Sequence, residues 1–532
     1  MSTGAETSDP SAAKPALVAS LGLFSATAIV VGSMIGSGIF IVPAEISRDV
    51  GSPALLIAAW LVTAVMTIIG ALSYGELAAM MPRAGGQYVY LREALGPIWG
   101  FLFGWTLFLV IQTGTIAAVA VAFGKFLGVF FPAVSSTHWI WHIAHVPAWH
   151  VGPMVLGNME IGLSTANLAG ILVILLLAVV NIFGVRLGAL VQNVFTTAKA
   201  AALLGLVAFG FLLGRNAAAI RANFGANFWH GASWHHLHPL QIGVGGPITM
   251  VGLLTILAVV QTGSLFSADA WNNVTYTAGE VRNPRRNLPW SLAFGTALVL
   301  ALYILCNVVY LLVLPLHGNP HGSTIVARGI QHASEDRVAT AALQQIFSHT
   351  GAYLMAGAIL VSTFGCANGL TLAGARVYYA MSRDGLFFRA AGELHRRWRT
   401  PVLALTVQAL WTCLLCISGS YSQLLDYIIC TELIFYILTI ASLFVLRVRR
   451  PEAERPYRAF GYPVLPAIYI LMAAWICIVL LRYKPQYTWP GLVIVLLGIP
   501  VYGVWSSRSV SESSPRRLSS SGQIPGGSAD HG

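Results

Sequence analysis

The sequence predicts an all-α polytopic membrane protein with twelve transmembrane helices, and three observations lead to that prediction. Of the 532 residues, 56% are hydrophobic and only 9% are charged, whereas a soluble domain carries about 25% charged residues. The mean hydropathy is +0.73. The apolar residues fall into blocks of about 20, the length that a helix needs to cross a hydrocarbon core about 30 Å thick. So few charges cannot cover a water-soluble fold, which excludes a large globular protein.

Twelve apolar blocks meet this length requirement. They lie near residues 19–43, 53–80, 97–131, 164–184, 189–214, 247–277, 289–315, 350–380, 401–418, 424–446, 463–482 and 488–507. The blocks predict one membrane domain over residues 18–507. Residues 1–17 and 508–532 are rich in small and polar residues with little apolar surface to bury, so both are expected to be disordered tails.

The basic residues predict the orientation. Arginines gather in the loops that share a side with the N-terminus and are sparse in the alternate loops. Because basic loops stay in the cytoplasm, both termini are expected there. This bias also accounts for the net charge of +11, so nucleic acid is not an expected partner and membrane lipid is. The excess of arginine over lysine favours a bacterial protein of the inner membrane.

Two of the predicted spans are interrupted at mid-membrane. The first contains three glycines between Gly32 and Gly38, and the sixth contains a carboxylate and two amides between Leu265 and Asn273. Glycine lowers helix propensity by about 1 kcal/mol per residue, and a mid-membrane carboxylate needs a partner or water. Broken helices five spans apart are typical of inverted repeats, here 19–214 and 247–446, with peripheral helices over 463–507 and a substrate bound between the breaks. Gly32 and Gly36 are also spaced as a helix-packing surface.

Six stretches over most of the chain then carry a family resemblance. They are Gly36–Phe40, Pro82–Tyr88, Val194–Lys199, Gly279–Pro289, Ser382–Gly385 and Arg450–Tyr457. The first resembles the first-helix signature of the amino acid-polyamine-organocation (APC) superfamily, and the others narrow the resemblance to the L-type amino acid transporter branch. The resemblance implies a LeuT-like fold of five plus five helices and sodium-independent amino acid transport, usually by exchange.

The breaks offer what a zwitterionic substrate needs. Backbone N–H groups of Ser37 and Gly38, at the start of a half-helix, suit the carboxylate, and carbonyls at Ile35 and along 266–269 suit the ammonium. The expected substrate-binding residues are Ile35, Gly36, Ser37, Gly38, Phe266, Ser267, Asp269 and Asn272. Phe266 stands where related carriers keep an aromatic gate, although a phenylalanine in a span is ordinarily a packing residue.

Asp269 departs from the family pattern, because many animal members of the branch have glycine there. Its carboxylate could neutralise the substrate ammonium, favour cationic substrates or carry a proton. The alternative is a structural carboxylate bonded to the unwound backbone or to Asn272.

Lys199 is the basic residue deepest in a span. It matches the family lysine that stands near the cation site of sodium-coupled relatives, so its ammonium is expected to bond first-span carbonyls and groups such as Ser362 or Thr363. Loss of its proton on burial would instead make it a proton-coupling site. The remaining alternative is an ammonium that snorkels to the interface.

Other features receive no functional role. One helical face could hold His138, His142 and His145, as a zinc site needs, but no acidic or cysteine ligand lies nearby. Solvated loops are expected for these residues and for His230, His235, His236 and His238. Cys413 and Cys416 lie on an apolar helix. Asp426 and Glu432 are expected to line an external vestibule or cap a helix. No phosphate loop, protease pattern, metal site or cofactor site is recognised. The segment 132–162 has no cysteine for the disulfide-linked heavy chain of animal relatives.

The leading hypothesis is an amino acid exchanger or proton symporter. One rival is a polyamine or cationic amino acid carrier, which Asp269 favours. Another is a membrane nutrient sensor that keeps the fold without turnover. An intramembrane enzyme has the least support, because no catalytic group accompanies the polar residues.

Overall fold

The computed structural model describes residues 19–147, 149–151, 154–156, 159–183, 185–229, 250–417 and 421–513. The expected tail 1–17, most of the expected tail 508–532, and His230, His235, His236 and His238 lie outside the described residues. The helix α19 reaches Ser513, a few residues beyond the predicted end of the last span.

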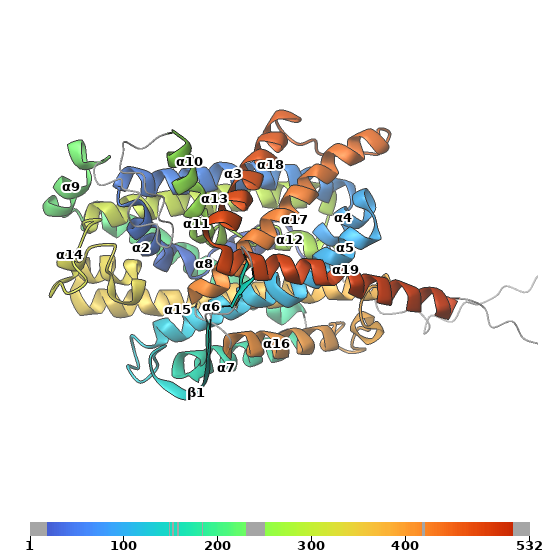
Figure 1. The fold of residues 1–532 in the computed structure, drawn as a ribbon, viewed down its shortest axis with the longest axis horizontal. Helices are drawn as coiled ribbons and strands as arrows, with labels where there is room; N and C mark the ends of the chain where they lie inside the picture. The colour runs from blue at the N-terminus through green and yellow to red at the C-terminus, as the bar shows by residue number, and fades with distance from the viewer. Residues whose placement is uncertain are drawn as a thin grey trace, which may run out of the picture.

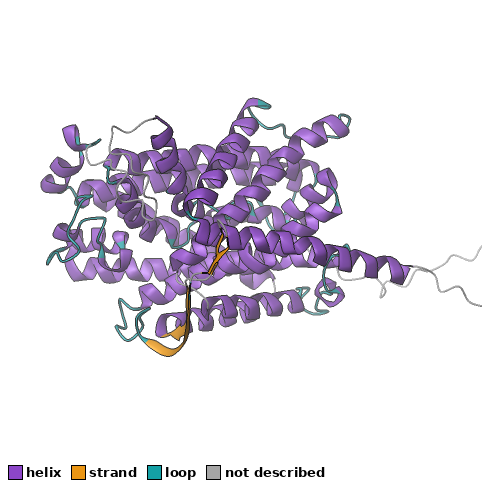
Figure 2. Cartoon of the chain, viewed as in Figure 1, coloured by secondary structure: helices purple, strands orange, loops and turns teal. Residues whose placement is uncertain are grey.

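Helices form most of the described chain (Figure 2). Those in the predicted spans are α1 (Leu23–Met34), α2 (Gly38–Val50), α3 (Pro53–Met80), α5 (Pro97–Thr106), a π turn (Leu107–Ile111) and α6 (Gln112–Leu127), α7 (Thr165–Ile182), α8 (Val185–Leu212), α10 (Met250–Val259), α11 (Gln261–Ser267), α12 (Asn273–Tyr276), α13 (Pro284–Val313), α15 (Val338–Arg383), α16 (Val402–Ile417), α17 (Tyr421–Arg449), α18 (Val464–Tyr483) and α19 (Pro485–Ser513). Shorter helices outside the predicted spans include α4 (Gln87–Leu95), α9 (Ala217–Asn223) and α14 (Ile325–Arg328).

Among the described residues, ten helices are long and apolar enough to cross a membrane, taking α1 with α2 and α5 with α6 as one each. The ninth predicted span corresponds to the shorter apolar helix α16. The sixth is divided among α10, α11 and α12, none of which is long enough alone. The predicted class, an all-α polytopic membrane protein, is therefore confirmed.

The helix α15 extends well before the predicted eighth span of 350–380. Its backbone leaves the helical region at Phe347 and Ser348, where Ser348 has φ 55°. The long helix therefore has two parts, and only the second corresponds to the prediction. The first part was missed because it is short and amphipathic rather than continuously apolar.

The histidine-containing segment after α6 forms strands, not a helix. Strand β1 (Trp139–Val146) pairs antiparallel with β4 (Met159–Ser164), and β2 (Trp149–Val151) pairs with β3 (Met154–Leu156). A helical face shared by His138, His142 and His145 is therefore wrong, because strand residues alternate between two faces. Trp139 packs edge-on against His142, with ring centroids 5.3 Å apart.

The two interrupted helices lie inside the bundle. Helix α1 contacts α8, α13 and α15, while α2 contacts α11 and α15. Helices α18 and α19 pack against α17, away from α1 and α2. Figure 1 shows α9 and α14 at one end of the bundle and α4 at the other, so these are called the α14 end and the α4 end.

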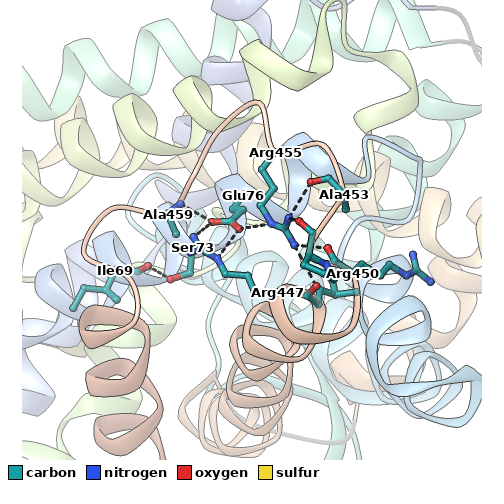
Figure 3. Close-up of polar contacts among 10 residues, drawn as sticks. Ile69, Ser73, Glu76, Arg447, Arg450, Ala453, Arg455 and Ala459 are labelled. Atoms are coloured by element: carbon teal, nitrogen blue, oxygen red, sulfur yellow. Dashed lines mark hydrogen bonds and ion pairs between the residues drawn. The ribbon is translucent and has the colours of Figure 1, made fainter.

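A buried carboxylate ties three segments together at the α4 end (Figure 3). Glu76 of α3 is fully buried and accepts hydrogen bonds from Arg447 of α17, at 3.0 and 2.6 Å, and from the backbone N–H of Ala459, at 2.7 Å. Arg455 Nε lies 3.3 Å from the same carboxylate. We call these four residues the Glu76 cluster. A carboxylate removed from water is tolerated only with such partners, so the cluster holds α3, α17 and the segment after α17 in one arrangement.

Replacing Glu76 should destabilise the protein. Glu76→Ala leaves two arginines without their buried counter-charge, and breaking such a pair costs about 3–5 kcal/mol. We expect a clear fall in the melting temperature of the purified protein in detergent. Glu454→Gln is the matched control, because Glu454 pairs with Arg285 while 71% exposed and such pairs contribute little. Equal melting temperatures for the two variants would contradict the structural role of the cluster.

Candidate functional site

The first helix is broken between Met34 and Gly38. The N–H of Ile35 still bonds the carbonyl of Val31, at 3.0 Å, but Gly36 N–H turns to Met34 O, at 2.8 Å, and Ile35 takes ψ 87°. Helix α2 then begins at Gly38. Carbonyls at the end of α1 therefore lose their helical N–H partners. They need hydrogen-bond donors from elsewhere in the protein, because lipid in the hydrocarbon core offers none.

Lys199 of α8 donates some of the hydrogen bonds that these carbonyls need. Its ammonium donates to the carbonyls of Gly32 and Ile35, the latter at 2.9 Å, and lies 3.4 Å from the carbonyl of Ser362 on α15. Lys199 is only 1% exposed. The side chain points at the break, so the alternative of an ammonium snorkelling to the interface does not describe this structure.

The helix α15 faces the same break. The Ser362 hydroxyl lies 3.0 Å from the carbonyl of Ile35 and 3.1 Å from that of Gly36. Cys366, one turn further along α15, lies with its Sγ 3.0 Å from the carbonyl of Ser33. Thr363 does not join them, since its hydroxyl bonds Ile359 O of its own helix at 2.9 Å. Residues four positions apart share a face of an α-helix, so Ser362 and Cys366 face the break together while Thr363 is turned aside.

The second break lies between Ser267 of α11 and Asn273 of α12, with Ala270 at φ 62°. It approaches the first break so closely that Gly38 has no room for a side chain. A Cβ on Gly38 would lie 2.1 Å from Ser267 Oγ and 2.8 Å from Ser267 Cα. Phe266, the expected gate, is 6% exposed on α11. The predicted substrate-binding residues of the two spans therefore lie together.

Tyr303 of α13 connects the two breaks. Its hydroxyl lies 3.0 Å from the carbonyl of Met34 and 3.1 Å from the carbonyl of Ser267. The sequence reasoning missed this residue. Its only signal was a polar group in the middle of an apolar span, and tyrosines at such positions are common.

Asp269 has partners that the sequence did not identify. The Tyr436 hydroxyl of α17 donates to Asp269 Oδ1 at 2.6 Å, and the carboxyl of Glu432, also on α17, lies beside that of Asp269. Glu432 is 4% exposed, and its Oε2 is buried without a hydrogen-bond partner. Glu432 thus lines neither an external vestibule nor a helix end.

Asn272 is engaged elsewhere. Its amide donates to Gln87 Oε1 and lies near the hydroxyl of Tyr276, both at 3.0 Å. The alternative in which Asn272 holds Asp269 is therefore wrong. The side chain of Asp426 lies outside what the structure describes. Among the described residues, no group of three or more His, Cys, Asp or Glu side chains could hold a metal ion.

A buried ion pair at the α4 end joins α15 to the segment after α12. Arg376 Nε of α15 lies 3.2 Å from Glu280 Oε1, just after α12, and both side chains are at most 1% exposed. The carbonyl of Glu280 accepts the N–H groups of Ser20 and Leu21, each at 2.9 Å. The segment before α1, the segment after α12 and α15 are therefore fastened together at this end.

Comparisons with known proteins agree with one another. The amino acid permease family model matches residues 21–503. Large neutral amino acids transporter small subunit 2 of Rattus norvegicus is 30% identical over 488 residues, which is 92% of this chain and 80% of the relative. The b(0,+)-type amino acid transporter 1 of Homo sapiens is 29% identical over 90% of this chain and 85% of its own. The serine/threonine exchanger SteT of Bacillus subtilis is 28% identical over 92% of this chain and 98% of its own.

Removing the Tyr303 hydroxyl should loosen the two breaks. Tyr303→Phe leaves the carbonyls of Met34 and Ser267 without this donor, and a buried polar group without its partner costs about 1–3 kcal/mol. We expect a lower melting temperature in detergent. The matched control is Tyr310→Phe on the same helix, which loses one 3.2 Å contact to Ile39 O and touches neither break. A loss for Tyr303→Phe no greater than for Tyr310→Phe would rule out the bridging role.

Proposed function

The chain belongs to the amino acid permease family, and on that premise we propose that it carries amino acids across the membrane without sodium, by exchange or by proton symport. It is an integral multi-pass membrane protein. The observation that carries the proposal is the Lys199 ammonium, which binds the carbonyls at the first helix break and supplies there the positive charge that a cation would otherwise supply.

The substrate would bind between the breaks. The first N–H groups of α2, beginning at Gly38, have no acceptor within the helix and stand at its positive end, which suits a carboxylate. The last carbonyls of α11, near Phe266 and Ser267, suit an ammonium. The contact between Gly38 and Ser267 places the donor set beside the acceptor set. A free amino acid carries both charges a few ångströms apart, so this arrangement matches its backbone rather than any one side chain.

Sodium independence follows from the charge of Lys199. The carbonyls of Gly32 and Ile35 and the Ser362 hydroxyl make an oxygen-rich group of the kind that binds a monovalent cation. An ammonium fixed among them leaves neither the space nor the negative potential for a sodium ion. Lys199 stays in place through the transport cycle in this proposal, unless it exchanges its proton.

Exchange is the preferred mode, because SteT is named as an exchanger and aligns along 98% of its length. Exchange and proton symport differ in whether the empty carrier reorients, which is a difference of free energy between states. The ion pair Glu280–Arg376 and the Glu76 cluster close the α4 end. Substrate binding at the breaks must weaken them before release on that side.

A cationic substrate is the second candidate, and the carboxyl pair favours it. Asp269 lies in the second break, Glu432 approaches it from α17, and Glu432 Oε2 has no hydrogen-bond partner. A substrate with a side-chain ammonium or guanidinium would gain a charge-assisted bond to these carboxyl groups. A polyamine would use the same carboxyl groups.

The cellular setting remains part of the proposal. We place the protein in a bacterial inner membrane with both termini in the cytoplasm, because basic residues concentrate at the α4 end. A disulfide-linked heavy chain is not expected, since no cysteine stands between α6 and α7.

Uptake into proteoliposomes tests the main proposal. We expect uptake of radiolabelled neutral amino acids to be unchanged when sodium is replaced by choline. Lys199→Met should lower it roughly tenfold or more, because each lost charge-assisted hydrogen bond contributes about 1.5–3 kcal/mol. Lys484→Met is the matched control, because Lys484 bonds Thr262, away from the first break. Sodium-dependent uptake by the wild type would overturn the proposal.

The same vesicles separate the modes of transport. Uptake that needs internal amino acid and survives without a pH gradient establishes exchange. Gradient-driven uptake into empty vesicles that Lys199→Met abolishes establishes proton coupling. Substrate binding by well-folded protein with no uptake in either format would replace the transporter proposal with a sensor.

The carboxyl pair is tested by substrate charge. We expect Glu432→Gln to lower lysine uptake about tenfold more than leucine uptake, a difference of about 1.4 kcal/mol. Asp269→Asn should act in the same direction, and the exposed Glu454→Gln should change neither substrate. Equal effects on lysine and leucine would show that the pair does not distinguish substrate charge.

A further inference from the structure

A cavity of about 420 Å³ lies at the α14 end and shares no residue with the breaks. It is lined by residues just after α6, by the segment 323–337 that contains α14, and by residues on both sides of the kink in α15. Nothing in the proposed transport mechanism uses this cavity. We call it the α15 cavity.

The start of α15 at the cavity wall favours an anion. The first part of α15 runs from Val338 to the kink at Phe347 and Ser348, and the second part begins at His349. Thr340 and Ala341 from the first part, and His349 and Ala352 from the second, line the cavity. The first N–H groups of a helix lack intrahelical acceptors, and the helix start carries about half a positive charge.

Two buried polar atoms at the start of α15 have no partner. Thr340 is 6% exposed, and its Oγ1 is buried with no hydrogen-bond partner. Arg337 Nε is also buried and unpaired, although Arg337 Nη2 donates to Lys125 O at 2.6 Å and to Glu335 at 2.7 Å. An unsatisfied buried group costs about 1–3 kcal/mol, and both residues line the cavity, so the two groups require an explanation.

The charges around the cavity are positive in balance. Arg328 and Arg337 both line it. Glu335 pairs with Arg337 but is 42% exposed, and Asp336 is engaged by Arg48 at 2.7 Å. Burial lowers the pKa of the Arg337 guanidinium, and Glu335 offsets only part of that shift.

We propose that the α15 cavity binds a small monovalent anion, held by Arg337 Nε and the Thr340 hydroxyl at the start of α15. The ligand is either an inorganic anion such as chloride or the carboxylate of a small organic molecule. Both would satisfy the same two donors, and the cavity volume accommodates either together with water. This site lies beyond the proposed transport function and does not depend on it.

The test uses thermal unfolding of the full-length protein in detergent, with chloride or acetate added at ionic strength held constant by a bulky buffer salt. We expect either or both anions to raise the melting temperature of the wild type by about 2 °C or more at saturation. A rise with chloride alone identifies an inorganic anion, and a rise with acetate alone identifies a carboxylate. No rise with either anion overturns the proposal.

Two variants and two controls locate the effect. Thr340→Val removes the unpaired hydroxyl with little change in shape, so it should melt higher than the wild type without anion and lose most of the anion-dependent rise. Arg337→Gln should abolish that rise. The controls are Thr406→Val, whose hydroxyl bonds Val402 O of its own helix at 2.9 Å, and the exposed Arg286→Gln at the α4 end. A full rise in both Thr340→Val and Arg337→Gln would overturn the proposal even if the wild type responds.

Discussion

The bond between the Lys199 ammonium and the carbonyls of Gly32 and Ile35 is the interaction on which the central architecture depends. A helix broken inside a membrane exposes carbonyls that neither water nor lipid can satisfy. Lys199 and the Ser362 hydroxyl satisfy them from α8 and α15. The break can then persist as a stable feature, with its remaining backbone groups available to a ligand.

The second break is held against the first by contacts of different kinds. The absence of a side chain at Gly38 lets Ser267 approach, and the Tyr303 hydroxyl reaches carbonyls on both sides. Buried ion pairs at Glu76 and Glu280 then fasten the α4 end. The two breaks are therefore held against each other by neutral hydrogen bonds and close packing, while the α4 end is fastened by buried ion pairs.

The role of Asp269 depends on the groups that surround it. Alone in an apolar span, it is an expensive carboxylate that needs a partner. Beside Glu432 and the Tyr436 hydroxyl, it belongs to a buried pair of carboxyl groups next to the second break. The cationic and neutral substrate hypotheses differ in whether these carboxyl groups contact the substrate.

The sequence by itself determined the membrane class, nearly all of the spans, the two breaks and the family, because hydrophobic length, glycine clusters and motifs are local signals. It also placed Lys199 and Ser362 at one site, through the resemblance. Only the tertiary structure revealed Tyr303, Glu432 and Tyr436, turned Thr363 to its own helix, paired Asn272 with Gln87, and made strands of the histidine segment. Such contacts join residues far apart in the chain, and the face that a side chain presents depends on how helices pack, which hydrophobic periodicity does not encode.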